Sequence, residues 1–130
     1  MKKLLSLVLT AAVPVLMLAG CGKYSSEYSA VGFVHSNTSD NAYMDFYTFD
    51  GTMVFELDGG SGKELKYKAK LEHGSAEVFC DRNGNREKLF TLNAGDELTS
   101  SVNDLSSDTV YIIVETEGKC ENGDLEFTVA

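Results

Sequence analysis

Short runs of alternating hydrophobic and polar residues, bounded by Gly, Asn and Asp, recur from Val31 to the end of the chain. No window in this region places apolar residues at helical spacing over three turns, so the pattern predicts β-strands. The expected strands are Val31–Ser36, Ala42–Phe49, Thr52–Leu57, Glu64–Glu72, Ala76–Cys80, Glu87–Leu92, Glu97–Val102, Thr109–Glu115 and Leu125–Val129. Eight or nine short strands in about 100 residues predict an all-β fold, an antiparallel and jelly-roll-like β-sandwich.

The dipeptide Asp50-Gly51 between two expected strands is typical of a type I′ turn, which would make a hairpin that pairs Phe49 with Thr52. The side of this hairpin that we expect to face the core carries Met44, Phe46, Thr48, Met53, Phe55 and Leu57. The opposite side carries the aromatic residues Tyr43, Tyr47 and Phe49. These three side chains either form an exposed face for a ligand or are covered by a second layer or by the preceding chain.

The strand Glu64–Glu72 alternates cleanly between one apolar face and a row of lysines, Lys66, Lys68 and Lys70. The lysines are expected to point to solvent. If this strand pairs with Thr52–Leu57, its lysines adjoin the carboxylates of the first hairpin. The run Val110–Val114 is apolar at every position, which predicts a strand that is buried on both faces.

The segment Leu4–Leu18 is almost wholly apolar and follows two lysines, which is typical of a secretory signal peptide over residues 1–20. It is shorter than the roughly 20 apolar residues of a membrane-spanning helix, and Pro14 interrupts it. The run Leu18-Ala19-Gly20-Cys21 resembles the lipobox of bacterial lipoproteins position for position.

That resemblance implies cleavage before Cys21 and a diacylglycerol thioether, carrying palmitate-type acyl chains, on the Cys21 sulfur. Two acyl chains anchor a protein stably to a membrane. We therefore expect residues 21–29 to be a lipidated tether and residues 30–130 a single domain on the extracytoplasmic face of the cell membrane. Cys80 and Cys120 then remain as an even pair in a compartment where disulfides persist, so either a bridge or two separate thiols is expected.

The chain carries a net charge of −9, and removal of Lys2 and Lys3 with the signal peptide makes it 9 − 20 = −11. This charge excludes nucleic acid as a partner through phosphate contacts. Residues 93–126 hold nine of the acids, for which a solvated acidic face is favoured over a calcium site. His35 and His73 have no second ligand at metal spacing, so calcium is the one cofactor considered.

The pattern of Leu65-x-Tyr67-x-Ala69-x-Leu71, the Asn83-Gly84 turn and the closing Leu125-x-Phe127-x-Val129 resembles the small bacterial sandwiches related to pre-peptidase C-terminal domains. The resemblance implies an accessory or binding module. The chain has neither a nucleophile elbow nor an H-E-x-x-H motif, so no enzyme is expected. Two hypotheses follow: a non-catalytic binding or structural module, with another surface protein as partner, and a carbohydrate or cell-wall polysaccharide module that uses Tyr43, Tyr47 and Phe49.

Overall fold

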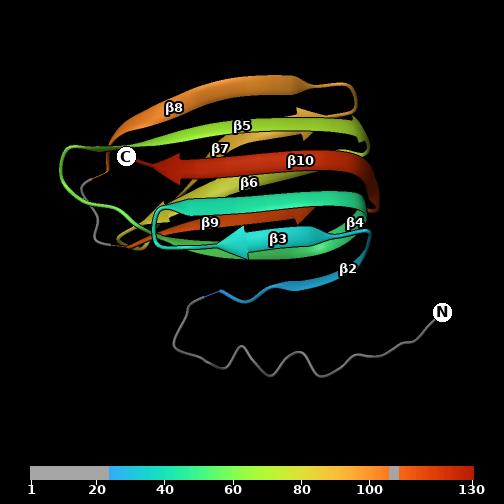
Figure 1. Cartoon of the computed structure of the whole chain (residues 1–130), viewed down its shortest axis with the longest axis horizontal. Coiled ribbons are helices and arrows are strands. Elements are labelled where there is room, and N and C mark those ends of the chain that lie inside the picture. The colour runs from blue at the N-terminus through green and yellow to red at the C-terminus, as the bar shows by residue number, and fades with distance from the viewer. Residues whose placement is uncertain (1–23, 106–108) are drawn as a thin grey trace.

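The computed structural model describes residues 24–105 and 109–130, and in this part of the chain all regular structure is β-strand (Figure 1). The strands are β2 Glu27–Val31, β3 Val34–Asn37, β4 Asn41–Asp58, β5 Lys63–His73, β6 Ser75–Arg82, β7 Asn85–Asn93, β8 Glu97–Leu105, β9 Thr109–Thr116 and β10 Cys120–Val129. The expected all-β, antiparallel sandwich of eight or nine strands is confirmed. The signal segment and Cys21 lie outside the described residues.

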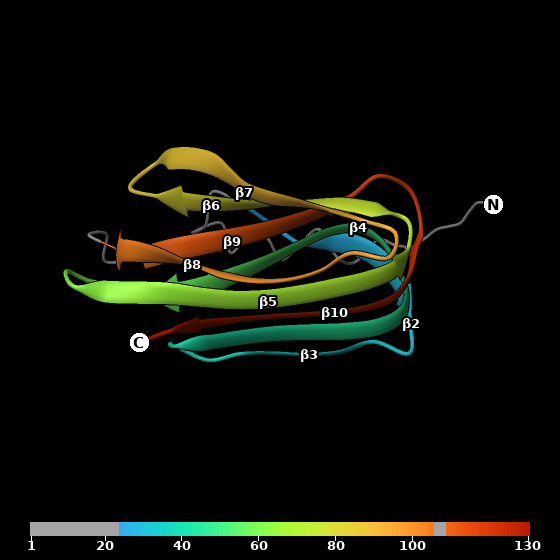
Figure 2. The same cartoon turned by 90° about the horizontal axis from the view of Figure 1, so that it is seen from above.

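The described strands form two layers that share β4 (Figure 2). Hydrogen bonding runs in the order β7-β6-β9-β4-β10-β5-β8, and β2 and β3 add to the free side of β4. Residues 41–49 of β4 pair with β10, whereas residues 52–58 pair with β9. We call β3, residues 41–49, β10, β5 and β8 the first sheet, and residues 52–58, β9, β6 and β7 the second sheet.

The strand β4 reverses its direction between its two halves. Both of its ends lie beside the β3–β4 turn, because the Asp58 amide donates to the Ser39 carbonyl and the Asn37 side chain bonds both the amide and the carbonyl of Glu56. The expected hairpin is therefore wrong: the reversal is at Asp50-Gly51, but the two halves join different sheets and do not pair with each other. The side-chain pattern predicted the reversal and could not tell these two arrangements apart.

Gly51 is required at this reversal. Its φ is +137°, and a Cβ placed there would lie 2.3 Å from the carbonyl oxygen of Glu27 and 2.7 Å from the Cα of Tyr28. Strand β2 thus passes so close to the bend that no side chain fits. The Gly51 amide donates to the Thr116 hydroxyl at 2.8 Å.

The core lies between the two sheets. Met44, Phe46, Met53, Phe55 and Leu57 are buried as expected, and they face one another across the sandwich instead of across a hairpin. In the run Val110–Val114, the side chains of Val110, Ile112 and Val114 are buried on one face and that of Ile113 is buried on the other. This confirms the prediction for this strand.

Strand β5 shows the predicted alternation, and its neighbours are strands other than the one considered from the sequence. Leu65, Tyr67, Ala69 and Leu71 are buried, and the three lysines are exposed. The strand pairs with β10 and β8, not with residues 52–57. The pairing considered for its charges does not occur, because β10, which is last in sequence, inserts between β4 and β5 and supplies the carboxylates itself.

The expected tether is part of the folded domain from Tyr24 onward. Strand β2 pairs with residues 48–52 of β4, and the Ser26 hydroxyl accepts a 2.8 Å hydrogen bond from the Val54 amide. The polar composition of this segment suggested a free linker. Its backbone is instead held by β4, whose free edge it covers.

Candidate functional site

Three adjoining hollows form a groove along the outer face of the first sheet. The largest, of about 430 Å³, shares Lys70, Glu97 and Asp124 with a second of about 180 Å³. The second shares Lys68 and Thr99 with a third of about 260 Å³. The groove follows β10 and β5 from Asn122 to Thr128, which is roughly 20 Å at the rise of a strand. It is therefore elongated and open, a shape that suits an extended ligand.

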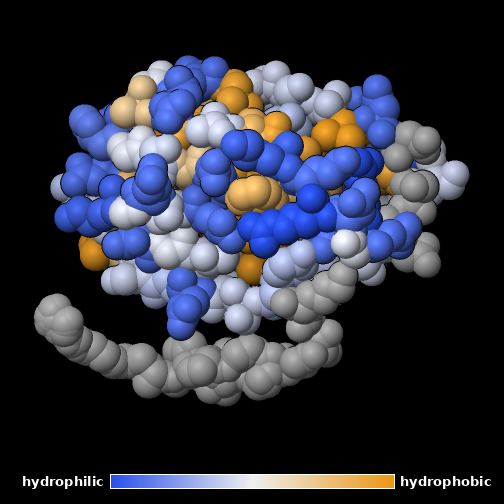
Figure 3. Space-filling model, turned by 180° about the vertical axis from the view of Figure 1, so that it is seen from behind, coloured by the Kyte–Doolittle hydropathy of each residue, from blue (hydrophilic) through white to orange (hydrophobic). Residues whose placement is uncertain are grey.

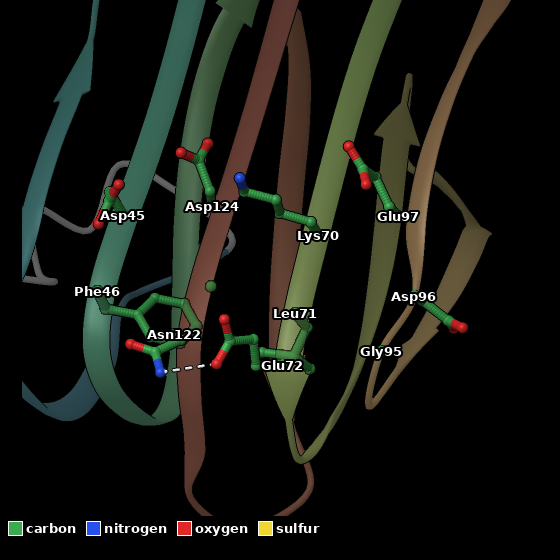
Figure 4. Close-up of a pocket in the computed structure, with 11 residues that line it drawn as sticks. Asp45, Phe46, Lys70, Leu71, Glu72, Gly95, Asp96, Glu97, Asn122 and Asp124 are labelled. Atoms are coloured by element: carbon green, nitrogen blue, oxygen red, sulfur yellow. Dashed lines mark hydrogen bonds between the residues drawn. The ribbon is translucent and has the colours of Figure 1, made fainter.

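The floor of the groove is a row of charged side chains on four neighbouring strands. Asp45 on β4 pairs with Asp124 on β10, which pairs with Lys70 on β5, which in turn pairs with Glu97 on β8. Figure 4 shows the Lys70 ammonium directed toward Asp124. Partial burial, and then the neighbouring Asp45 carboxylate, raise the pKa of Asp124, while Lys70 opposes the rise. Two like charges and one ammonium thus share the middle of the groove.

A second row lies one step along the same strands. Tyr43, Glu126, Lys68 and Thr99 are successive cross-strand partners. Lys68 Nζ lies 3.6 Å from Glu126 Oε1, and the Tyr43 hydroxyl donates to Asp45 Oδ2 at 3.1 Å. Burial, and then the hydrogen bond to Asp45, raise the pKa of Tyr43. The rows offer carboxylate acceptors and ammonium donors side by side.

The end of the groove is shaped by a glycine and an amide. A Cβ at Gly123 would lie 2.3 Å from the Phe46 ring, so the absence of a side chain lets that ring pack against β10. Next to it, the Asn122 amide donates to Glu72 Oε1 at 3.0 Å (Figure 4). Asn122 has a φ of +54°, a conformation that asparagine tolerates better than most residues. This local distortion places a polar side chain at the rim.

The three aromatic residues expected on one face are separated by the structure. Tyr47 is 56% exposed, Tyr43 is half-buried on the same outer face, and Phe49 is wholly buried. For Phe49 the exposed face is wrong and the alternative of cover by the preceding chain is confirmed. The burial alternation of β4 is irregular between Phe46 and Phe49, so that residues 42, 44, 46 and 49 are the buried ones. Phe49 stacks on Tyr28 and lies against Phe33 and Phe46.

Exposed apolar side chains flank Tyr47. Val31 on β2 and Val34 on β3 are 61% and 62% exposed. Between them the carbonyl of Gly32 accepts from the Tyr47 amide at 3.2 Å. Tyr47, Val31 and Val34, which we call the apolar rim, therefore lie beside the charged rows.

Cys80 and Cys120 are two separate, buried thiols. Cys120 Sγ donates to the carbonyl of Ser75 at 3.4 Å, and Cys80 lies five residues further along β6, roughly 16 Å away. A disulfide requires Cα atoms within about 7 Å, so the expected bridge is wrong. Burial raises the pKa of Cys80 to about 11 and also raises that of Cys120.

The acids of residues 93–126 do not gather at one place. Glu97, Asp124 and Glu126 are at the groove, whereas Glu115 and Glu117 line a hollow of about 390 Å³ on the second sheet. Asp96 also lines the largest hollow of the groove, where its carboxylate accepts from the Asn93 amide in a turn, and Asp108 lies outside the described residues. Within residues 24–105 and 109–130, no three His, Cys, Asp or Glu side chains converge as metal ligands.

Sequence reasoning missed Lys70, Glu97, Asn122 and Asp124 as site residues. The alternation of the expected strand Glu64–Glu72 placed Lys70 on a solvent face, which was correct, whereas Asn122 and Asp124 lay outside the expected strand Leu125–Val129. Only the strand order brings those faces together.

The fold and the groove define this part of the chain as an antiparallel β-sandwich module with an elongated polar groove on one outer face. No protein-family model matches the chain, and no curated protein matches it. Among its described residues, no helix is long and apolar enough to cross a membrane.

Several solved structures are similar to it. A family 61 carbohydrate-binding module in complex with β-1,4-galactotriose is 13% identical, with a TM-score of 0.43 over 82% of this chain and 85% of that one. The Aeromonas hydrophila periplasmic inhibitor of g-type lysozyme is 12% identical, with a TM-score of 0.47 over 71% and 88%. A C-terminal family 6 carbohydrate-binding module of a Zobellia galactanivorans laminarinase is 12% identical, with a TM-score of 0.40 over 80% and 99%. At these values the ligands of those proteins do not transfer to this chain.

Proposed function

We propose that this protein is a lipid-anchored, extracytoplasmic module that binds a polysaccharide, such as a cell-wall glycan, along the groove of the first sheet. The lipobox ending at Cys21 supports the anchor and the location outside the cytoplasm. The role is binding without catalysis. The groove itself, with an exposed tyrosine at its side, is the observation that carries the proposal.

The chemistry of the groove suits a sugar chain. Hydroxyl groups donate to carboxylates and accept from ammonium groups, and Asp124, Glu126, Lys68 and Lys70 offer both kinds of partner within two neighbouring rows. Hydrogen bonds to charged groups are stronger than those between neutral groups. The exposed ring of Tyr47 adds an apolar surface for the C–H face of a sugar, with a hydroxyl at its tip.

The charge of the groove limits the kind of polysaccharide. Its largest hollow is lined by five acids, Asp45, Glu72, Asp96, Glu97 and Asp124, and by one lysine, Lys70. An anionic polymer would be repelled there. We therefore propose a neutral or amino-bearing glycan as the ligand class.

Retention on insoluble glycans and purified cell wall tests this proposal. The domain should be retained, and Tyr47→Ala and Lys70→Ala should each reduce retention several-fold. Glu77→Gln, which removes an exposed acid on the second sheet, is the matched control and should bind like the wild type. No retention on any glycan, or retention unchanged in both groove variants, contradicts the proposal, and release of reducing ends contradicts a role without catalysis.

The apolar rim favours a second candidate, a surface protein as partner. Exposed valines beside a tyrosine are typical of protein contacts more than of sugar contacts. Val34→Asp separates the two, because it should abolish binding to a protein partner while leaving retention on glycans unchanged.

A further inference from the structure

Tyr24, where the described part of the chain begins, is fixed to the outer face of the second sheet. The Tyr24 hydroxyl donates to the carboxylate of Asp81 on β6, and the Tyr24 ring lies 5.5 Å from that of Tyr111 on β9. Val78 and Cys80 on β6 point to the core, so Asp81 points to the opposite, outer face. It is nevertheless only 2% exposed. The hydrogen bond and this burial make Tyr24 a docked residue.

An arginine completes the Tyr24 site. The Arg86 guanidinium lies 4.2 Å from the centre of the Phe79 ring and 6.0 Å from that of Tyr24. It also bonds Glu115 Oε2 at 2.9 Å. Ile113, between Tyr111 and Glu115 on β9, is 1% exposed. Seen from behind, this face shows hydrophobic residues set among hydrophilic ones (Figure 3).

The following residues keep the segment in place. Ser26 Oγ accepts from the Val54 amide and donates to Met53 Sδ at 3.8 Å, and β2 begins at Glu27. From Tyr24 to Ser26 the chain is therefore held by side-chain contacts on the second sheet, and β2 then pairs with residues 48–52 at the bend of β4. Cys21 precedes Tyr24 by three residues, which span at most about 11 Å.

We infer that the docking of Tyr24 on Asp81 orients the domain on the bilayer, with the second sheet toward the membrane and the groove of the first sheet away from it. The inference rests on the proposed lipid anchor at Cys21. An anchor so close to the Tyr24 site keeps that face near the headgroups. The two sheets of a sandwich lie about 10 Å apart, so the groove opens on the opposite side.

The charges of the two outer faces agree with this orientation. On the second sheet, Arg82, Arg86 and Lys88 each bond a carboxylate, those of Glu87, Glu115 and Glu77. The largest hollow of the groove has five acids to one lysine. An anionic bilayer would repel the acids of this hollow, whereas the three cations of the second sheet are each paired with an acid.

Fluorescence quenching on vesicles tests the orientation. The full lipidated chain is reconstituted into phosphatidylcholine–phosphatidylglycerol vesicles that contain a headgroup-attached quencher. A fluorophore is placed either at Lys88→Cys, on the outer face of β7, or at Ser101→Cys, on the outer face of β8. Both native thiols of the domain can remain, because they are buried. The label at residue 88 should be quenched at least threefold more than the label at residue 101.

The same ratio in variants tests the role of the docking. The ratio of quenching at residue 88 to quenching at residue 101 should fall to about one in Tyr24→Ala and in Asp81→Asn. The control Asp58→Asn, an exposed acid-to-amide change at the end of β4, should preserve this ratio. Equal quenching of the two labels in membrane-bound wild type overturns the orientation, and a ratio that survives both variants overturns the role of Tyr24. Fractionation of Cys21→Ala tests the anchor separately: if the wild type is no more membrane-bound than this variant, anchor and orientation both fail.

Discussion

Asp45 on β4 and Asp124 on β10 are direct cross-strand partners, so two carboxyl groups face each other in the middle of the groove. Like charges in this position destabilise a sheet. The Lys70 side chain on the next strand offsets part of this repulsion. A pair that costs stability at the centre of a groove is typical of a site arranged for a ligand.

Replacing one of these acids should therefore stabilise the fold. We expect Asp124→Asn to raise the free energy of unfolding at pH 7 by roughly 0.2–1 kcal/mol, because it removes the repulsion from Asp45. Urea denaturation measures the difference. Asp58→Asn, whose cross-strand partner is Thr109, should show no such gain.

The gain from Asp124→Asn should depend on pH. Because the pKa of Asp124 is raised, the folded protein holds this proton to higher pH than the unfolded chain, and wild-type stability falls as pH rises through the folded-state pKa. The asparagine variant lacks this loss. The extra stability of Asp124→Asn over the wild type should be present at pH 7 and should vanish below the ordinary aspartate pKa of about 3.9. An advantage that grows on acidification would contradict the raised pKa.

Gly51→Ala tests the reversal of β4. The new methyl group would collide with the backbone of β2, so we expect a loss of roughly 2–3 kcal/mol in the free energy of unfolding. Gly118→Ala is the matched control, because Gly118 also has a positive φ but nothing within 4 Å of the added Cβ. It should lose roughly 1–2 kcal/mol, from backbone strain alone. Equal losses would mean that β2 does not approach the bend.

Truncation of the two aromatic residues Tyr47 and Phe49 of β4 should have very different effects on stability. Phe49→Ala removes a wholly buried ring and should cost about 3–5 kcal/mol of stability. Tyr47→Ala removes an exposed ring and should change stability by less than about 0.5 kcal/mol. Thermal and urea unfolding measure both. Similar effects at the two positions would contradict the change of face.

The thiols of Cys80 and Cys120 should be free and slow to react. Because both are buried and the pKa of Cys80 is raised to about 11, a maleimide should label neither thiol readily in the native, non-reduced domain at pH 7.5. In urea without reductant, two equivalents should react within this domain. If the two thiols react in urea only after reductant is added, Cys80 and Cys120 form a disulfide and the assignment of two free thiols is wrong.

The sequence by itself determined the fold class and the faces of most strands. Alternation along β5 and β10 is a local property, since successive side chains of a strand point to opposite faces whatever the strand pairs with. The lysine row, the apolar partners beneath it and the doubly buried Val110–Val114 run could therefore be predicted from single segments. The reversal at Asp50-Gly51 was also visible, because few dipeptides favour such a turn.

Only the tertiary structure decided which strands are neighbours, and with that the site. Whether the halves of β4 pair or join different sheets depends on β9 and β10, which come more than fifty residues later and add along the whole of β4. Their insertion puts Asp124 between Asp45 and Lys70 and keeps Cys80 away from Cys120. The irregular stretch between Phe46 and Phe49 moved one aromatic ring to the core. Contacts between distant segments set all of these features, so no local pattern of residues could reveal them.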